Sequence, residues 1–280
     1  MLPNLIIIGG MKCGTSSLHH YLSLHPQICM SKIKELNYFP EDLNWKKGVR
    51  WYQSHFNCRA QIYGEASTAY TAFPHYPGVP EKIYRLIPKT KLIYLIRNPV
   101  ERIISHYMDY VSEGVETRPI NDVLKNFHNN EYVDRSRYAF QLDQYLEFFP
   151  KGKILVVKQE DLLRQRLETL QKIFRFLTVD ESFRSQQFGV KLNESRYKRR
   201  KNRFGRLLSN LNKTGWFNCL SRPLTYQVGR WVYIPFSKRI ETSILDQGLE
   251  RELMDYFQEG IKRLETMTGY DLSEWNRPQR

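Results

Sequence analysis

The first seventeen residues contain the feature that most constrains the fold of this chain. Residues 5–8 are an apolar run rich in isoleucine, which is typical of a buried strand. Three glycines between residues 9 and 14 then permit a tight turn whose backbone N–H groups converge, and Thr15 opens a helix that extends to about residue 24. A strand, a glycine-rich turn and a helix in this order predict an α/β fold with an anion-binding loop.

The lysine of this loop lies in an unusual position. In loops that bind nucleoside triphosphates a lysine directly follows the last glycine, whereas Thr15 takes that position in this chain and Lys12 lies inside the turn. From there a lysine cannot extend along a triphosphate in the usual way. The sequence therefore favours a shorter anionic group bound directly over the loop, by residues Lys12, Cys13, Gly14, Thr15 and Ser16.

The length and the charge of the chain define its class. With 280 residues, 41% of them hydrophobic, the chain is long enough for one sizeable α/β core, and we expect a single domain over residues 1–280. Its formal net charge of +14 favours an anionic partner: a nucleotide, a phosphate- or sulfate-bearing metabolite, an acidic glycan, nucleic acid or a membrane surface. Residues 191–206 carry eight Lys or Arg residues against one acid, which predicts a loop or a mobile segment.

The cysteines and the start of the chain favour the cytoplasm. The four cysteines are scattered, without C-x-x-C or metal-ligand spacing, so we expect reduced thiols and no bound metal. The first residues lead into the first strand without a charged segment, a cleavage site or an apolar run of about 18 residues. We expect a cytoplasmic protein without a transmembrane segment, and peripheral contact with a membrane surface is compatible with its charge.

The rest of the chain alternates strands with helices. Further strands are predicted at residues 62–65, 91–96 and 153–157. Helices are predicted at residues 80–87, from residue 100, and at 137–149, 160–177 and 245–268. This alternation indicates a central parallel sheet between two layers of helices.

A second polar motif follows the strand at 91–96. Arg97 lies at the carboxyl end of that strand, the edge at which open parallel sheets bind ligands. Ser105 lies eight residues further on, about two turns into the next helix. A guanidinium group and a hydroxyl can hold a single phosphate between them. Alone, the two residues would fit a surface ion pair and an ordinary helix serine equally well, but the first loop makes a phosphate site the better interpretation.

These two motifs, in this order, resemble the nucleotide-binding motifs of the sulfotransferases that use 3′-phosphoadenosine 5′-phosphosulfate (PAPS). The segment 10–16 is similar to the 5′-phosphosulfate loop of that family, and 97–107 is similar to its 3′-phosphate motif. Three further segments are similar to the bacterial and heparan-sulfate-type branch, at residues 34–39, 64–70 and 272–275. The resemblance covers nearly the whole chain and is weakest over residues 191–243.

The resemblance implies a PAPS-dependent sulfotransferase with a three-layer α/β/α fold. PAPS would be the co-substrate and adenosine 3′,5′-bisphosphate (PAP) the product, with no metal and no nucleic acid. The acceptor would be a hydroxyl of a glycan, glycolipid or small molecule, with a carbohydrate or glycoconjugate preferred. Negative charge grows on the leaving phosphate during sulfuryl transfer, and Lys12 and the loop N–H groups would stabilise it.

The resemblance also places a general base at Glu35, in a polar stretch between aromatic residues; the alternative is a solvated loop carboxylate. Glu65, at the end of the second strand, would position substrate or only bond within the site. The heparan-sulfate-type enzymes often carry a lysine just after this glutamate, whereas this chain has Ala66, so their acceptor specificity does not transfer directly. Residues 191–206 would close over the nucleotide, line a groove for an acidic substrate or be solvated.

Two other functions explain part of the pattern. A P-loop nucleotide kinase needs a lysine directly after Gly14 and an acidic Mg²⁺ ligand at a strand end, and the sequence shows no clear candidate for either. A non-catalytic polyanion-binding protein would explain the net charge, but it would not need the loop together with Arg97 and Ser105. Binding of PAP separates the sulfotransferase from both alternatives.

Overall fold

The computed structural model describes residues 1–190, 199–201, 237–239 and 245–276. These residues form two compact units, which are described separately. The first contains residues 1–103, 126–190 and 247–276, and the second contains residues 104–125 with the short described pieces between 199 and 246. The expectation of one domain over the whole chain stays a prediction, and most of the basic segment 191–206 lies outside the described residues.

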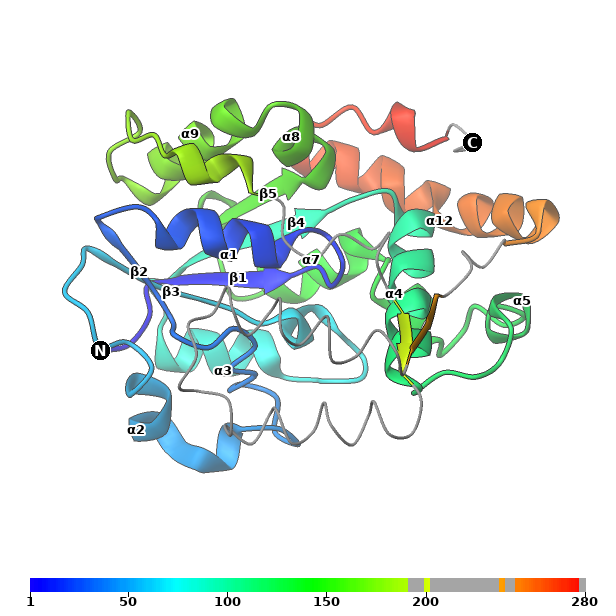
Figure 1. Cartoon of the computed structure of the whole chain (residues 1–280), viewed down its shortest axis with the longest axis horizontal. Helices are drawn as coiled ribbons and strands as arrows, with labels where there is room; N and C mark the ends of the chain where they lie inside the picture. Colours follow the sequence, from blue (N-terminus) through cyan, green and yellow to red (C-terminus); the bar gives the residue numbers. More distant parts are fainter. Residues whose placement is uncertain (191–198, 202–236, 240–244, 277–280) are drawn as a thin grey trace. The chain divides into compact units, whose positions relative to one another are not determined.

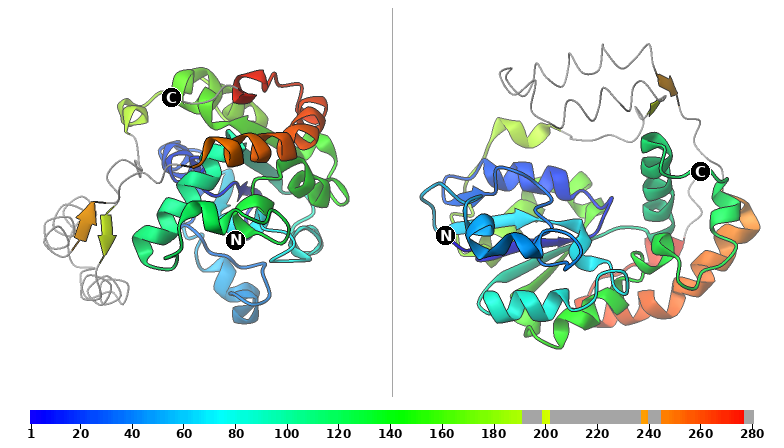
Figure 2. Two further views of the ribbon diagram at one scale, coloured as in Figure 1. Left: turned by 90° about the vertical axis from the view of Figure 1, so that its right-hand side faces the viewer. Right: turned by 90° about the horizontal axis from the view of Figure 1, so that it is seen from below.

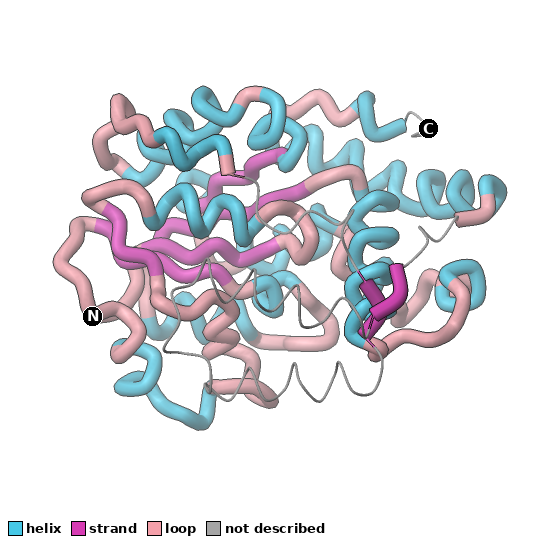
Figure 3. The backbone as a smooth tube through the Cα atoms, in the orientation of Figure 1, coloured by secondary structure: helices cyan, strands magenta, loops and turns pink. Residues whose placement is uncertain are grey.

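A five-stranded parallel sheet forms the centre of the first unit, in the order β2-β3-β1-β4-β5 (Figures 1 and 3). Its strands are β1 (Leu5–Gly9), β2 (Ile28–Met30), β3 (Ile62–Ala66), β4 (Lys91–Ile96) and β5 (Ile154–Lys158). Every residue of β1 and β3 is buried, as is β4 after its first residue. The apolar runs therefore form the core of the sheet, because parallel strands covered on both faces have no solvated side.

Helices lie on both sides of this sheet, which confirms the three-layer α/β/α fold. Figure 2 (right) shows α1 (Thr15–Ser23) on one side and α3 (Val79–Leu86) and α12 (Gln247–Thr268) on the other. The helix α7 (Tyr138–Leu146) contacts both α3 and α12. The remaining helices of this unit are α2 (Gly48–Gln53), α6 (Glu131–Asp134), α8 (Gln159–Arg164), α9 (Arg166–Leu177) and the 3-10 turns η1 (Trp45–Lys47), η2 (Thr68–Thr71), η3 (Lys151–Lys153), η4 (Gln186–Gly189) and η7 (Ser273–Asn276).

Most predicted elements occur within a few residues of their expected bounds, and two predictions need correction. The edge strand β2 was missed because three residues are too few to show a periodic pattern. The helix predicted over 160–177 is two helices, α8 and α9, because Gln165 between them has φ −125° and ψ 48°, outside the helical region.

The second unit begins inside the helix α4 (Pro99–Glu113), between Ile103 and Ile104. It also contains α5 (Ile120–Val123) and the antiparallel strands β6 (Arg199–Lys201) and β7 (Ser237–Arg239). Among the helices that the structure describes, none combines the length and the apolar character needed to cross a membrane.

Cys29 and Cys58 form a disulfide, with Cα atoms 6.1 Å apart. The expectation of reduced thiols is wrong for this pair. Cys29 lies in β2 and Cys58 follows α2, and two cysteines in such different elements give no sign of pairing in the sequence. Cys13 is a free, buried thiol, and Cys219 lies outside the described residues. Since disulfides persist mainly in oxidising compartments, the cytoplasmic localisation loses one of its supports and stays a prediction.

Candidate functional site

The loop after β1 has the glycines and the backbone conformations of a tight turn. Gly9 ends β1, and a Cβ atom at this position would lie 2.0 Å from Thr71 Oγ1, so a side chain cannot be accommodated. Gly14 has φ 92° and precedes the first residue of α1, in a left-handed conformation that glycine adopts without steric cost. Lys12 has φ 68° and is the non-glycine residue of the loop in this conformation. The loop therefore has the turn that its glycines predict.

The start of α1 offers N–H groups to an anion, whereas two N–H groups of the loop are already used. Within the loop, Gly10 N–H donates to Leu95 O at 2.7 Å and Cys13 N–H donates to Gly10 O at 3.1 Å, so both are already used by the protein. The first helical N–H groups of α1, at Thr15 and Ser16, have no acceptor inside the helix, and the helix dipole adds positive potential there. The start of α1 thus has the N–H groups that an anion-binding site needs.

Cys13 contributes to the core rather than to the loop surface. Its side chain is fully buried, and its Sγ atom lies 3.7 Å from the hydroxyl of Tyr138. Burial raises the pKa of the Cys13 thiol to about 11, although the charges of Arg97 and Arg102 oppose this shift. The group is therefore a neutral thiol near pH 7. A nucleotide contact of Cys13, which the sequence predicted, would have to come from its backbone.

Arg97 follows β4 directly and reaches the loop after β1. Its Nη1 atom donates to Lys12 O at 3.3 Å, and its Nη2 atom forms an ion pair with Glu101. The Nε atom of Arg97 is buried and has no hydrogen-bond partner among the described residues. Arg97 is thus fixed against the loop after β1, and its buried Nε donor is unsatisfied among the described residues.

Asn98 is a functional neighbour that the sequence reasoning missed. Its Oδ1 atom accepts from Val100 N–H at 3.0 Å, so it caps α4, and its Nδ2 atom donates to Trp275 O at 3.0 Å. Glu160 accepts from both Asn98 N–H and Trp275 Nε1–H, which locks the turn after β4. An Asn directly before a Pro at a helix start is the local signal that would have identified the cap. Its partners come from distant parts of the chain and left no such signal.

Ser105 lies in α4, with 8% of its surface exposed. It belongs to the second unit, whereas Arg97 belongs to the first. The pairing of these two side chains on one phosphate therefore stays a prediction.

Glu35 lies on the segment between β2 and η1 and is fastened to the turn after β3. Its backbone N–H donates to Ala66 O at 2.8 Å. Its Oε2 atom accepts from Thr68 N–H at 2.7 Å and from Thr68 Oγ1 at 3.2 Å, and its Oε1 atom forms an ion pair with Lys34. The side chain is 33% exposed, so Glu35 is held in place without being buried, and a general base must likewise be fixed within reach of its substrate.

Glu65 is buried completely, unlike Glu35. Its two carboxylate oxygens accept hydrogen bonds from the hydroxyls of Tyr52, Tyr70 and Ser67. Burial raises the pKa of Glu65, and these hydroxyl donors oppose the shift. The geometry favours the second of the two roles stated from the sequence, bonding within the site, over direct contact with substrate.

The segments that carry these residues meet at one edge of the sheet. β1 pairs with β3 on one side and with β4 on the other. Ser67 N–H, after β3, donates to Ile7 O at 3.1 Å, while Arg97, after β4, bonds to Lys12 O. The ends of β3, β1 and β4 are neighbours. They therefore place Thr68, which binds Glu35, beside the Lys12 loop and Arg97, at the edge where parallel sheets bind ligands.

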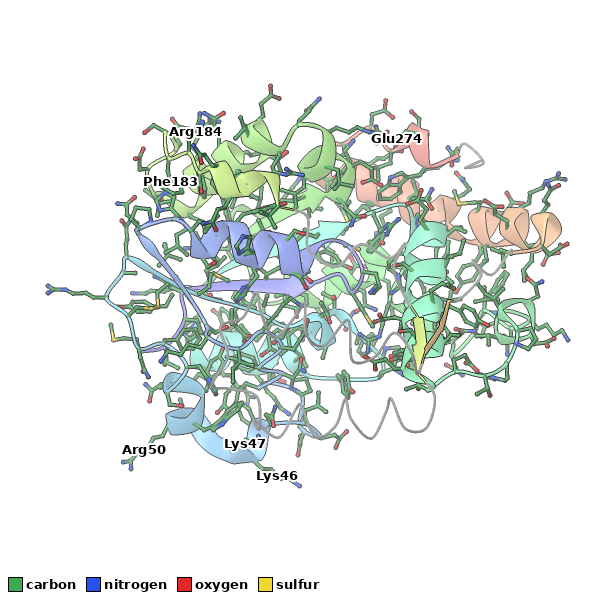
Figure 4. All side chains as sticks on the ribbon, viewed as in Figure 1. Lys46, Lys47, Arg50, Phe183, Arg184 and Glu274 are labelled. Atoms are coloured by element: carbon green, nitrogen blue, oxygen red, sulfur yellow. A yellow bond between two sulfur atoms is a disulfide. The ribbon has the colours of Figure 1, made fainter. Side chains whose placement is uncertain are left out.

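An aromatic and basic segment follows Glu35 in the chain. The rings of Trp45 and Trp51 pack near Tyr38, with centroids 5.2 and 6.2 Å away, and both tryptophans are partly exposed. Lys46, Lys47 and Arg50 are exposed side chains of η1 and α2, and they project from the ribbon there (Figure 4).

Comparison with protein families finds one match that covers most of the chain. Residues 2–204 match the family described as the sulfotransferase domain. Among curated proteins, the heparan sulfate glucosamine 3-O-sulfotransferase 5 of Homo sapiens is 33% identical over 210 residues, which cover 70% of this chain and 58% of that protein. The bifunctional heparan sulfate N-deacetylase/N-sulfotransferase 2 of Bos taurus is 28% identical over 200 residues, covering 64% of this chain and 22% of that protein. The chain thus spans little more than half of the first relative and under a quarter of the second.

A solved structure with the same fold gives a broader match. The crystal structure of a sulfotransferase from Alicyclobacillus acidocaldarius superposes with a TM-score of 0.71 and 25% sequence identity. The superposition covers 99% of this chain and 100% of that chain.

Proposed function

This chain belongs to the family of proteins with a sulfotransferase domain, and from that premise we propose that it transfers a sulfuryl group from PAPS to a hydroxyl of an acceptor. The observation that carries the proposal is the meeting of three strand ends. The Lys12 loop follows β1, Arg97 follows β4, and Glu35 is fastened to Thr68 after β3. One edge thus offers anion ligands beside a carboxylate base.

The residues at this edge suit the two anionic groups of PAPS. Lys12 and the first N–H groups of α1 suit the 5′-phosphosulfate, because the loop is short and its lysine lies within it. Arg97 suits the 3′-phosphate, because a guanidinium group binds phosphate through several N–H donors and this one lies against the Lys12 loop. Ser105 is the proposed second contact of that phosphate.

The chemistry requires one proton acceptor and one charge stabiliser. The acceptor oxygen forms a bond to sulfur while the bond between sulfur and the leaving phosphate oxygen breaks, and PAP departs. Glu35 takes the proton of the acceptor hydroxyl, which makes that oxygen a better nucleophile. Lys12 and the helix N–H groups stabilise the charge that develops on the leaving phosphate.

We propose a carbohydrate or glycoconjugate as the acceptor. The partly exposed rings of Trp45 and Trp51 would stack on sugar rings, and Lys46, Lys47 and Arg50 would attract an acidic polymer. The relatives named as heparan sulfate sulfotransferases support this class. A phenolic or lipid acceptor would also suit the aromatic rings, so the assay must include one.

Calorimetric titration with PAP tests the nucleotide site without any assumption about the acceptor. We expect binding in the micromolar range or tighter, and a loss of about 10- to 100-fold in Arg97→Ala, because a hydrogen bond to a charged group contributes about 1.5–3 kcal/mol. Lys89→Ala is the matched control, since Lys89 is an exposed cation at a distant turn. No detectable PAP binding by the wild-type protein would refute the proposal.

A transfer assay then tests the base and the acceptor together. Radiolabelled PAPS is incubated with desulfated heparan sulfate and, separately, with para-nitrophenol. We expect label in the polysaccharide, and Glu35→Gln should lower its transfer by about 10²- to 10⁴-fold while PAP binding is retained. Transfer to para-nitrophenol alone would contradict the acceptor class, and unchanged turnover in Glu35→Gln would contradict the base.

A further inference from the structure

We propose that Glu65 is a positioning residue, which holds the segment that carries Glu35 in the conformation needed for proton transfer. The proposal rests on the proposed function only for the role of Glu35 as base. The hydrogen bonds that carry it are independent of that role, and they connect the end of β3 to residues 37 and 38.

The Glu65 carboxylate is the centre of a buried cluster of hydroxyl groups. Oε1 accepts from the hydroxyl of Tyr70 at 2.6 Å and from that of Tyr52 at 2.7 Å, and Oε2 accepts from Ser67 Oγ at 2.7 Å. Glu65 and the three residues that donate to it are all buried. A charged group in such a place is retained only if its hydrogen bonds are satisfied, so the cluster must be well ordered.

Two of these hydroxyls continue to the backbone of the Glu35 segment. Ser67 Oγ accepts from Asn37 N–H at 3.0 Å, and the hydroxyl of Tyr70 accepts from Tyr38 N–H at 3.0 Å. Each hydroxyl has a single proton, and the backbone N–H must be the donor to it. Both protons are therefore directed at Glu65, and the carboxylate orients the two acceptors that the segment uses.

The segment needs such support because its backbone is unusual. Glu35 has φ 60° and Asn37 has φ 45°, so two residues in three occupy the left-handed region without being glycine. Such conformations cost free energy and persist only where the surroundings impose them. The hydrogen bonds that the backbone donates to Ser67 and Tyr70 impose this conformation just after Glu35. Thr68 holds the Glu35 carboxylate itself.

Tyr52 offers an internal control. Its hydroxyl also donates to Glu65, but its link to the segment is the stacking of its ring on Tyr38, with centroids 4.3 Å apart and an interplanar angle of 9°. Tyr52→Phe removes a bond to the carboxylate and keeps this stacking. The position of the segment should then be preserved.

In Glu65→Gln the new side chain has the same shape as the old one, but it cannot form the same set of hydrogen bonds. A carboxylate accepts on both oxygens, whereas an amide accepts on one side and donates on the other. If the amide nitrogen faces Ser67, the proton of Ser67 loses its acceptor. If it faces the two tyrosines, the proton of Tyr70 loses its acceptor. The glutamine can therefore orient only one of the two hydroxyl groups through its proton.

Amide hydrogen exchange resolved at residues 37 and 38 tests the connections without substrate. Tyr70→Phe should accelerate exchange at Tyr38 by about 2- to 10-fold, and Ser67→Ala should do the same at Asn37, in line with the loss of one hydrogen bond each. Glu65→Gln should accelerate exchange at one or both sites, and Tyr52→Phe at neither. The proposal would be overturned if the exchange rate of each of these two amides were the same in Glu65→Gln, Tyr70→Phe and Ser67→Ala as in wild type.

A kinetic cycle tests whether the positioning reaches the base. With radiolabelled PAPS and desulfated heparan sulfate, Glu65→Gln should lower kcat by about 10- to 100-fold, as a misplaced catalytic group does, with PAP affinity unchanged. In the Glu35→Gln background it should cause no further loss, because the base is already absent. A loss of the same size in that background would mean a general structural role and would overturn the proposal. If the wild-type protein transfers no sulfate to desulfated heparan sulfate, the proposed acceptor fails, and if it also binds no PAP, the proposed function fails. The exchange pattern still decides the positioning role in either case.

Discussion

The Lys12 loop (residues 9–14) and the segment that carries Glu35 lie beside each other and are built in different ways. The turn of the loop follows from its own glycines and from α1, which begins directly after it, although Leu95 and Arg97 also bond to the loop. The Glu35 segment is held in an unfavourable backbone conformation by side chains about thirty positions away, from the end of β3. Local structure depends on few residues, whereas a segment held from a distance also depends on the residues that support it.

The largest effect in this comparison is expected at the Lys12 loop. Lys12→Gln should lower kcat by about 10²- to 10³-fold, because the loss of one charge-stabilising donor at a leaving oxygen typically costs this much. The fall in PAP affinity should be smaller, since the α1 N–H groups remain. Sulfuryl transfer and calorimetry on the same preparation measure both. Lys89→Gln, an exposed lysine far from the loop in sequence, serves as the control, and equal kcat in the two variants would refute the role of Lys12.

The second effect tests the side that is held from a distance. The Cys29–Cys58 disulfide closes a loop of 29 positions that contains Glu35. Cys29→Ser should lower the free energy of unfolding by about 3–4 kcal/mol, as loop-closure entropy predicts. PAP affinity under native conditions should hardly change, because the Lys12 loop lies outside the segment that the disulfide closes. Urea denaturation with and without reductant measures the difference, and wild-type protein in reductant should match the variant.

Peptide mass spectrometry of protein from the native cells decides whether the disulfide occurs there. A free Cys29 thiol in that material would remove the basis of this prediction and would favour the cytoplasmic localisation.

The third effect concerns the buried thiol of Cys13, a residue of the Lys12 loop. The Cys13 pKa is raised from 9.0 to about 11 in the folded protein, so between these values the unfolded chain loses a proton that the folded protein keeps. Stability contributed by this group is therefore fully present below pH 9 and falls as the pH rises to about 11, by up to about 2–3 kcal/mol. The difference in unfolding free energy between wild type and Cys13→Ala, followed by urea denaturation across this range, isolates the contribution from that of the buried tyrosines. A difference independent of pH would contradict the prediction.

The smallest effect sharpens the account of Arg97. Glu101 forms an ion pair with Arg97 and would compete with a phosphate for the guanidinium. Glu101→Gln should therefore tighten PAP binding by no more than about 5-fold, the range expected for a partly exposed ion pair. Calorimetry of this variant beside wild type provides the test. Weaker binding would instead mean that Glu101 orients Arg97 for the nucleotide.

Those features that depend on neighbouring residues were predictable from the sequence. The turn at Gly9–Gly14, the position of Arg97 after an apolar strand and the end of α12 at Gly269 all follow from local backbone preferences. The placement of Glu35 as a candidate came from resemblance, and its anchoring to Thr68 was not foreseen. Glu65 illustrates the limit, because the same sequence position suited a substrate contact and a buried support equally well.

The sequence by itself determined most of the strands and helices, the glycine-rich turn before α1 and the family that the chain resembles. The strands, the helices and the turn follow from periodicity and from the conformational freedom of glycine, which act within a few residues. Only the tertiary structure decided that Cys29 meets Cys58, that Glu160 and Trp275 lock Asn98, and that Glu65 supports the Glu35 segment. Each of these contacts joins residues far apart in the chain, and the sheet order β3-β1-β4 is what brings the candidate site residues to one edge.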